Sequence, residues 1–245
     1  MPRGCRISNL GGDGVSIVEL AACRLKLRDG RWDYQTENRT AIEANWEMAR
    51  SSNSKLFNGD VFIVEDWKIE AGVLEARLVQ TKFAAYLYWR GRGFHDGRYD
   101  EAFATTAVFA NDGGMLVARA VEGTLNEGHY VSPGGLIDAR DLGRDGLIDP
   151  GGAAVRELAE ETGLTAKIAR RRPGFLLARD APYLALASVF DVAVDSAELL
   201  SRVRAFIDHE AAPELLDPMI LRRREDIGAV KLTTPTRLIA AHLLD

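Results

Sequence analysis

The sequence predicts an α+β protein, in which a mixed β-sheet carries helices on both faces as an α/β/α sandwich and a small α+β subdomain precedes it. Strand-like and helix-like segments alternate along the chain, as they do in sheets packed between helices. Residues 102–110 are rich in β-forming side chains, residues 111–114 form a turn signal, and residues 115–118 return as a strand. This hairpin excludes a purely parallel sheet.

The composition is that of an ordinary globular protein. The chain has 245 residues, 47% hydrophobic and 27% charged, enough for a core without disulfide or metal support. A net charge of −5 argues against broad nucleic-acid binding, which needs a basic surface. No apolar run approaches the ~18 residues of a membrane span, and the first residues lack the apolar stretch of a secretory signal. We therefore expect a cytoplasmic protein without membrane contact.

Cysteine and histidine show no spacing typical of a metal site. Cys5 and Cys23 are expected to be reduced, unpaired thiols. Of the histidines, only His129 lies next to a segment of interest, a glycine-rich loop.

Residues 1–100 are expected to form the N-terminal subdomain. A strand-like segment at residues 14–27 ends near the turn signal Asp29-Gly30. A helix is predicted over 36–50, paired strands over 61–64 and 73–79, and a short helix over 81–89. The glycine-rich, polar residues 91–100 are interpreted as a linker.

Residues 101–245 are expected to form the main domain. After the hairpin, Tyr130-Val131 is predicted as a strand that leads into a glycine-rich loop. A helix is predicted over 150–162, a strand over 184–194, and helices over 197–207 and 236–244.

The ends of the helix at 150–162 are clearly marked. Asp149 is placed to cap it, and Pro150 falls at the first helical position, where its missing N–H costs nothing. Gly163 follows the last turn, the usual place for a left-handed residue. The buried stripe is predicted to contain Ala154, Val155 and Leu158.

Three glutamates share one face of this helix. Glu157, Glu160 and Glu161 stand at i, i+3 and i+4, and Arg156 lies one turn before Glu160. A solvated acidic face is an equally good interpretation of the spacing, because repulsion between such pairs costs only about 0.2–0.5 kcal/mol. Spacing alone leaves a metal site and a surface face both open.

The segment RELAEETGL, residues 156–164, resembles the core of the Nudix box, R-E-U-x-E-E-x-G-U, at every specified position. It follows a strand and the pair Gly134-Gly135, as in the Nudix family, and the resemblance covers residue 103 to the C-terminus. It implies that Glu157, Glu160 and Glu161 bind Mg²⁺ or Mn²⁺ with help from the Gly134 carbonyl. Arg156, Glu160 and Glu161 are the predicted catalytic residues.

The resemblance implies hydrolysis of a phosphate–phosphate bond. Bound cations neutralise phosphate oxygens and acidify a water, and a carboxylate removes its proton as it attacks. The resemblance does not fix the general base. Glu210, Glu214 and Glu225 are candidates, and each has the alternative interpretation of an ordinary surface acid.

The first half of the box departs from the family pattern. Gly135 and Arg156 are 21 positions apart where the pattern has 14, so the loop carries seven extra residues. Counting forward six from Gly135 gives Asp141, and counting back eight from Arg156 gives Ile148; neither is the expected glutamate. Asp138, Asp141 and Asp145 are expected to be mainly solvated, with assistance to a metal by one of them as the alternative. Asp149 is expected to be a helix cap, with a metal-ligand role as the alternative.

The N-terminal part offers weak indications of the substrate. Residues 55–59, which contain Leu-Phe-Asn-Gly, resemble an element of the Nudix group of UDP-glucose/UDP-galactose diphosphatases, which also carry an N-terminal wing. The same four residues could form a turn with an aromatic anchor. A nucleotide-binding role competes with core packing for a cluster near the linker: Tyr86, Tyr88, Trp89, Arg90, Arg92, Phe94, His95 and Arg98. The arginines at 170–172 and 222–224 are expected to be exposed edges, with a phosphate grip as the alternative.

The leading prediction is a hydrolase of a nucleoside diphosphate linked to another moiety, such as a UDP-sugar. The alternatives are a nucleotide-binding or regulatory Nudix protein of weakened activity, or a Nudix hydrolase of ADP-ribose, dinucleotides or coenzyme A. The sequence contains no P-loop or GxGxxG motif that would favour a kinase or a dehydrogenase. It does not determine the oligomeric state.

Overall fold

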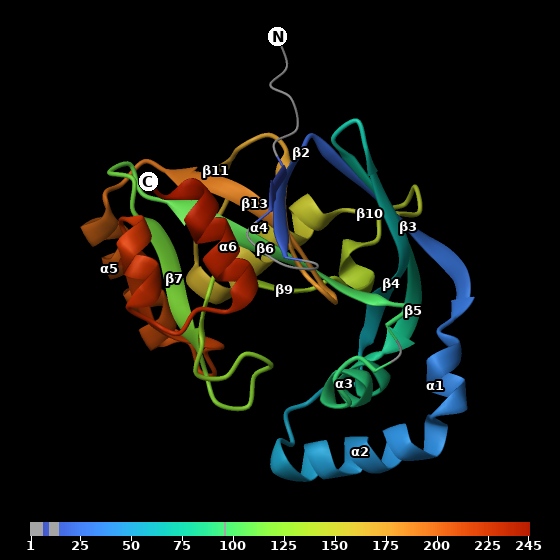
Figure 1. Cartoon of the computed structure of the whole chain (residues 1–245). Helices are drawn as coiled ribbons and strands as arrows, with labels where there is room; N and C mark the ends of the chain where they lie inside the picture. Colours follow the sequence, from blue (N-terminus) through green and yellow to red (C-terminus); the bar gives the residue numbers. More distant parts are fainter. Residues whose placement is uncertain (1–6, 10–14, 96) are drawn as a thin grey trace.

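A computed structural model describes residues 7–9, 15–95 and 97–245 (Figure 1). Cys5 and the first residues of the chain lie outside them. The elements follow in this order: β1 (Ile7–Asn9), β2 (Ser16–Leu20), β3 (Ala22–Arg31), α1 (Asp33–Glu37), α2 (Arg39–Ser52), β4 (Asp60–Glu70), β5 (Val73–Lys82), α3 (Phe83–Gly91), β6 (Asp100–Phe109), β7 (Met115–Ala120), β8 (Tyr130–Val131), β9 (Gly134–Leu136), the 3-10 helix η1 (Ala139–Asp141), β10 (Leu147–Ile148), α4 (Pro150–Thr162), β11 (Ala169–Arg171), β12 (Phe175–Asp180), β13 (Tyr183–Val192), α5 (Ser196–His209), β14 (Leu215–Leu221), the 3-10 helix η2 (Arg224–Gly228) and α6 (Thr234–Leu243).

The strands of the described residues form one mixed sheet. Its main path runs β1-β2-β12-β13-β6-β4-β5-β3-β10, and β7, with β8 and β14 beside it, branches from β6. β13 pairs parallel with β6 and β3 pairs parallel with β5, whereas the other pairs are antiparallel. The expected hairpin is present, with Phe109 opposite Met115. The prediction of a mixed sheet is confirmed.

Helices cover both faces of the sheet. Along β13, Leu184 and Leu186 belong to a core that includes Leu158 of α4 and Val203 of α5. The intervening residues of the strand face the other way and pack in a second core with Leu238 and Ile239 of α6. Because successive side chains of a strand alternate between faces, α4 and α5 lie opposite α6 (Figure 1). The predicted sandwich is confirmed.

The N-terminal strands continue this sheet. β2 pairs with β12, and Ile63 and Val64 of β4 stand opposite Glu101 and Asp100 of β6. One face of β4 and β5 joins the core beneath α4, and the other packs under α1, α2 and α3 in a cluster that includes Trp32, Tyr86 and Trp89.

Local structure follows the sequence closely, with two differences. The segment at 14–27 contains two strands rather than one, because Ala21 turns the chain and donates its N–H to the carbonyl of Gly72, 2.7 Å away. The helix expected over 36–50 begins earlier and is broken at Asn38, whose backbone and side-chain nitrogens both donate to Tyr34. The hairpin of β4 and β5 and the helices α3, α4, α5 and α6 are confirmed.

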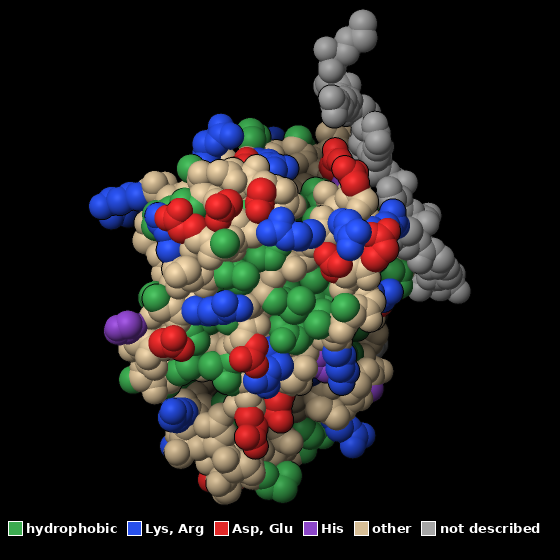
Figure 2. All heavy atoms as spheres, turned by 90° about the vertical axis from the view of Figure 1, so that its left-hand side faces the viewer, with side chains coloured by type: hydrophobic (Ala, Val, Ile, Leu, Met, Phe, Trp, Pro, Cys, Tyr) green, Lys and Arg blue, Asp and Glu red, His purple; other side chains and the backbone are tan. Residues whose placement is uncertain are grey.

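The surface carries both signs of charge. On the face at the left of Figure 1, Lys and Arg side chains lie among Asp and Glu side chains, around an area of hydrophobic ones (Figure 2). Across the described residues, we find no helix that is both long and apolar enough to pass through a membrane.

Candidate active site

Helix α4 carries the three glutamates and has the predicted ends. The Asp149 side chain accepts from the N–H of Gly151 at 3.0 Å, and Pro150 is the first helical residue. Gly163 ends the helix with a φ of +71°, where a side chain would be strained and a Cβ would meet the ring of Phe206. The cap interpretation of Asp149 is thereby confirmed, and the helix presents its glutamates toward the glycine loop.

The glycine pair of the box lies against this helix. A Cβ on Gly134 would stand 2.4 Å from the carbonyl oxygen of Ala104, so glycine permits β9 to pair with β6. A Cβ on Gly135 would stand 2.7 Å from the Glu157 carboxylate. Gly135 therefore leaves the room that Glu157 occupies.

The glutamates lie in different environments. Glu157 is buried, Glu160 is half exposed, and Glu161 accepts a hydrogen bond of 2.8 Å from the N–H of Gly134. Gly134 thus touches the site through its N–H, and the predicted role of its carbonyl stays a prediction.

Arg156 organises the carboxylates around it. Its Nη1 donates to Glu157 at 2.6 Å and to Glu160 at 3.2 Å. Its Nη2 donates to both oxygens of Asp141, at 2.9 and 3.1 Å. Hydrogen bonds between an arginine and a carboxylate are charge-assisted and therefore stronger than neutral ones. Arg156 therefore positions Glu157 and Glu160.

The expectation that Asp141 is solvated is wrong. Asp141 is only 7% exposed. Its carboxylate accepts hydrogen bonds from Arg156 and from the N–H of Asp138, the latter at 3.0 Å. Asp138 is itself paired with Arg140, whereas Asp145 accepts from the N–H of Leu147 within its turn. Asp141 is the residue reached by counting forward from Gly135, so the seven extra residues lie between Asp141 and Arg156.

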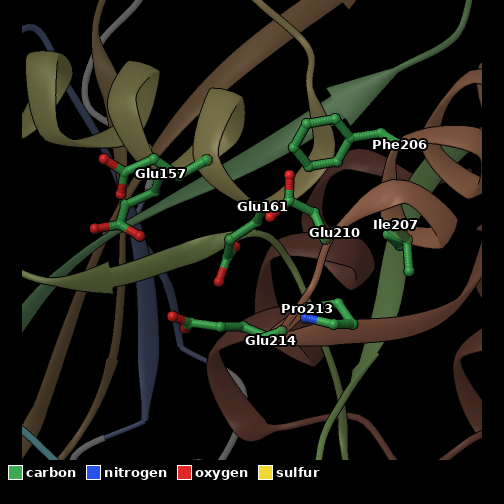
Figure 3. A pocket seen from close by; sticks show the side chains of 9 residues that line it. Glu157, Glu161, Phe206, Ile207, Glu210, Pro213 and Glu214 are labelled. Atoms are coloured by element: carbon green, nitrogen blue, oxygen red, sulfur yellow. The ribbon is translucent and has the colours of Figure 1, made fainter. Parts of the chain in front are cut away.

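A pocket of about 130 Å³ opens beside α4. Glu157, Glu160 and Glu161 line it together with two acids from the segment after α5, Glu210 and Glu214. Figure 3 shows Glu161 and Glu214 pointing into the same space and Glu210 beside the ring of Phe206. An apolar wall closes the pocket, formed by Phe206, Ile207, Ala212 and Pro213.

Glu210 and Glu214 are therefore part of the pocket rather than isolated surface acids. Glu225 lies apart from it, in η2, with an exposed side chain near Arg223. No spacing could reveal Glu210 and Glu214, because they meet α4 only through tertiary packing. The turn that brings Glu214 there is fixed by its carbonyl, which accepts from Val121 at 3.1 Å.

The electrostatics of the pocket are those of crowded acids. Burial raises the pKa of the Glu161 carboxyl well above its usual range, and the charges of Glu157, Glu214 and Glu160 raise it further, against the Gly134 N–H. Burial likewise raises the pKa of Glu157, against the opposing effect of Arg156. An added cation would relieve this repulsion.

The donor set fits a hard divalent cation. Mg²⁺ and Mn²⁺ prefer oxygen ligands, and Mg²⁺ commonly takes a few carboxylates and completes its shell with water and phosphate oxygens. Within the described part of the chain, however, no group of three or more Asp, Glu, His or Cys side chains is arranged so that it could hold a metal ion. Glu157, Glu160 and Glu161, with Glu214, are the residues that would hold the ion.

Other candidate residues have structural roles. Tyr86 and Trp89 are fully buried, and Arg90 pairs with buried Glu101 at 3.2 Å. Asn58 accepts from the N–H of Ala84 at 2.8 Å and so caps α3, whereas Phe57 is 82% exposed and anchors nothing. The arginines Arg172 and Arg222 pair with Asp191 and Asp112, and His129 is half-buried, its ring near the carbonyl of Glu127.

The sheet packed between helices carries the glycine pair on β9, and the glutamates of α4 with Arg156 lie beside that pair. Residues 99–202 match a family model described as the NUDIX domain. This part of the chain is therefore similar to the NUDIX domain, and the match supports a pyrophosphohydrolase of that type.

Several solved structures are similar to it. A Nudix hydrolase from M. smegmatis, RenU, is 15% identical with a TM-score of 0.39, over 58% of this chain and 81% of that one. The MutT protein of Methanosarcina mazei Go1 is 20% identical with a TM-score of 0.38, over 56% and 87%. A C. elegans Ap4A hydrolase is 16% identical with a TM-score of 0.39, over 58% and 97%. No curated protein matches this chain.

Proposed function

We propose that this protein is a Mg²⁺- or Mn²⁺-dependent hydrolase of a nucleoside diphosphate linked to a second moiety, with a UDP-sugar as the first candidate. The observation that carries the proposal is the convergence of Glu157, Glu160, Glu161 and Glu214 on one pocket. These carboxylates repel one another, and a bound divalent cation would lower that repulsion, which favours binding of the cation.

The chain's own residues would divide the work. Glu157, Glu160 and Glu161 hold the metal, which when bound neutralises phosphate oxygens and acidifies water. Arg156 keeps two of these carboxylates in place, and the Gly134 N–H keeps the third. Glu214, from a separate element, faces Glu161 and is our candidate for the base that removes the proton from the attacking water.

The choice of substrate class rests on two features. The pocket joins an acidic floor, suited to a metal-bound diphosphate, to the apolar wall of Phe206 and Pro213. The UDP-sugar candidate rests on the resemblance of residues 55–59 to the UDP-sugar diphosphatases. Asn58 accepts a hydrogen bond from the first turn of α3. We therefore interpret the resemblance as one of structure in the N-terminal part, not of substrate-binding residues.

One observation favours a second candidate, a nucleotide-binding protein of weak activity. The glutamates of the described residues do not already form a closed ligand set for one ion. Against this, both oxygens of Asp141 accept from Nη2 of Arg156 although the box lacks its upstream glutamate. We therefore place hydrolysis first.

The test is a screen of nucleotide sugars, ADP-ribose, dinucleotides and nucleoside triphosphates with Mg²⁺, measuring released phosphomonoester. We expect Glu161→Gln and Glu160→Gln to lower kcat by about 100-fold or more, the scale of losing a charge-stabilising group. Glu225→Gln, outside the pocket, is the control with an unchanged rate. Full activity in excess chelator would overturn the metal mechanism, and binding without turnover would favour the second candidate.

A further inference from the structure

The seven extra residues of the box, 142–148, fold into a short finger. Gly143 donates to the carbonyl of Leu147 at 2.7 Å, and Leu142 forms a bridge with Ile148. At its base, the N–H of Asp149 donates to the carbonyl of Asp141 at 2.9 Å. The finger therefore lies between Asp141 and Asp149, and Asp149 directly precedes α4.

The finger is attached to the N-terminal part of the chain. Its strand β10 pairs antiparallel with β3, with Leu147 opposite Lys26 and Ile148 opposite Leu25. Ile148 and Leu25 are 3% and 1% exposed and belong to the same core. Strand β3 in turn lies beside β5, which pairs with β4. The box insertion thus forms the edge of the N-terminal strands.

The base of the finger carries the carboxylate that holds Arg156. The Asp141 side chain is 3% exposed and pairs with Arg156 at 2.9 Å. An aspartate is one methylene group shorter than the glutamate of the family pattern, so its backbone must be held closer to the arginine. The finger, fixed by pairing with β3, supplies that constraint.

We propose that β3 and the finger form a positioning device for the active site. β3 fixes the finger through Ile148, the finger fixes Asp141, and Asp141 fixes the guanidinium that holds Glu157 and Glu160. The N-terminal part then contributes to the rate of the reaction, although neither Ile148 nor Asp141 nor Arg156 lines the pocket. This inference rests on the proposed function only where it is tested by measuring kcat.

The kinetic test is a double-mutant cycle on kcat with Ile148→Ala, Asp141→Asn and the double variant. We expect each single change to lower kcat by about tenfold or more, because small displacements of catalytic groups are costly. The double variant should be no slower than Asp141→Asn, since both changes act through Asp141. Leu177→Ala is the matched control: Leu177 is a buried core residue on β12, which pairs with β13 and β2, whereas the finger strand β10 pairs with β3.

The control separates positioning from stability. Leu177→Ala should lower the unfolding temperature as Ile148→Ala does, because both changes leave a cavity in the core. Below that temperature it should leave kcat unchanged. Combined with Asp141→Asn, it should lower kcat by the product of the two single effects, as expected for independent sites. The proposal would be overturned if Ile148→Ala and Leu177→Ala lowered kcat equally. It would also be overturned if the loss of kcat in the Ile148→Ala, Asp141→Asn double variant were the product of the two single losses.

A second readout needs no substrate. Amide hydrogen exchange should become faster at Asp141 and Asp149 in Ile148→Ala, and stay unchanged there in Leu177→Ala. Unchanged protection in Ile148→Ala would overturn the proposal even in an active enzyme. Faster exchange in a protein that hydrolyses nothing in the screen would support the positioning role of the finger while rejecting the proposed function.

Discussion

At Gly135 the absence of a side chain decides where Glu157 lies. A Cβ there would stand 2.7 Å from the Glu157 carboxylate, closer than such atoms approach. Gly135→Ala should therefore displace Glu157 and lower kcat by about tenfold or more, because Glu157 is buried and has little room to move. Steady-state kinetics checks this. Gly91→Ala is the control, since its Cβ would meet nothing within 4 Å; equal rates in both variants would contradict the argument.

Cys23 gives a prediction about pH. Burial raises the pKa of its thiol from 9.0 to about 12, although Arg171 lowers it. At pH 8 the reactive thiolate is therefore roughly a thousandfold rarer in the folded protein than in the unfolded chain. Iodoacetamide should label Cys23 only on unfolding, as read by mass spectrometry of a Cys5→Ser variant. Rapid labelling of the folded protein would contradict this.

The same shift fixes the sign of its effect on stability. The folded state binds the thiol proton more tightly than the unfolded state does. The contribution of Cys23 to stability is therefore fully present below pH 9 and is lost as pH rises from 9 toward 12. A Cys23→Ser variant should lack this loss.

Single residues also show how far the sequence reached. The glutamates of α4 share a face because helical spacing dictates it, and Arg156 contacts Glu160 as its position predicts. Asp141 was not predictable as a buried partner, because counting through a loop of altered length leaves two registers open. Glu214 is brought to the pocket by pairing of β14 with β7, which sequence spacing does not encode.

At the scale of elements, α4 was predictable to the residue because both of its ends carry a chemical signal. Asp149 supplies the cap and Gly163 the left-handed end. The helix at 36–50 lacked such signals, and its break at Asn38 depends on bonds to Tyr34. The finger β10 was not predictable, because it is a strand only where β3 pairs with it.

The cap at Asp149 can be separated from a metal role. Asp149→Ala should destabilise the protein by about 1 kcal/mol, the typical value of an N-cap, because the Gly151 N–H loses its acceptor. Urea denaturation measures the loss. The Mg²⁺ concentration for half-maximal activity should not change, because Asp149 does not line the pocket; Asp149→Asn, which retains a capping oxygen, should restore stability. A raised metal requirement in Asp149→Asn would show a ligand role instead.

At the scale of the whole molecule, the N-terminal part and residues 101–245 are joined through one sheet. β2 pairs with β12 along five residues, from Phe175 to Arg179. Arg90 of α3 reaches the buried Glu101 of β6 at 3.2 Å and the carbonyl of Leu125 at 3.0 Å. Composition and turns divided the chain near residue 100, but pairing between distant strands could not be predicted from them.

This shared sheet makes the division near residue 100 a test of the fold. A chain of residues 101–245 would lose β2 and β4, leaving the edges of β12 and β6 unpaired. It would also lose Phe62, Leu78 and Leu25, which pack in the core beneath α4. Exposed strand edges and apolar surface promote aggregation.

We therefore expect residues 101–245 to aggregate, or to lack cooperative urea unfolding, when examined by size-exclusion chromatography and circular dichroism. The full chain should unfold in a single transition followed identically by tryptophan fluorescence and circular dichroism, because its buried tryptophans, Trp32 and Trp89, lie in the N-terminal part. A monodisperse, cooperatively folded 101–245 fragment would show instead that the N-terminal strands are an accessory to an independent domain.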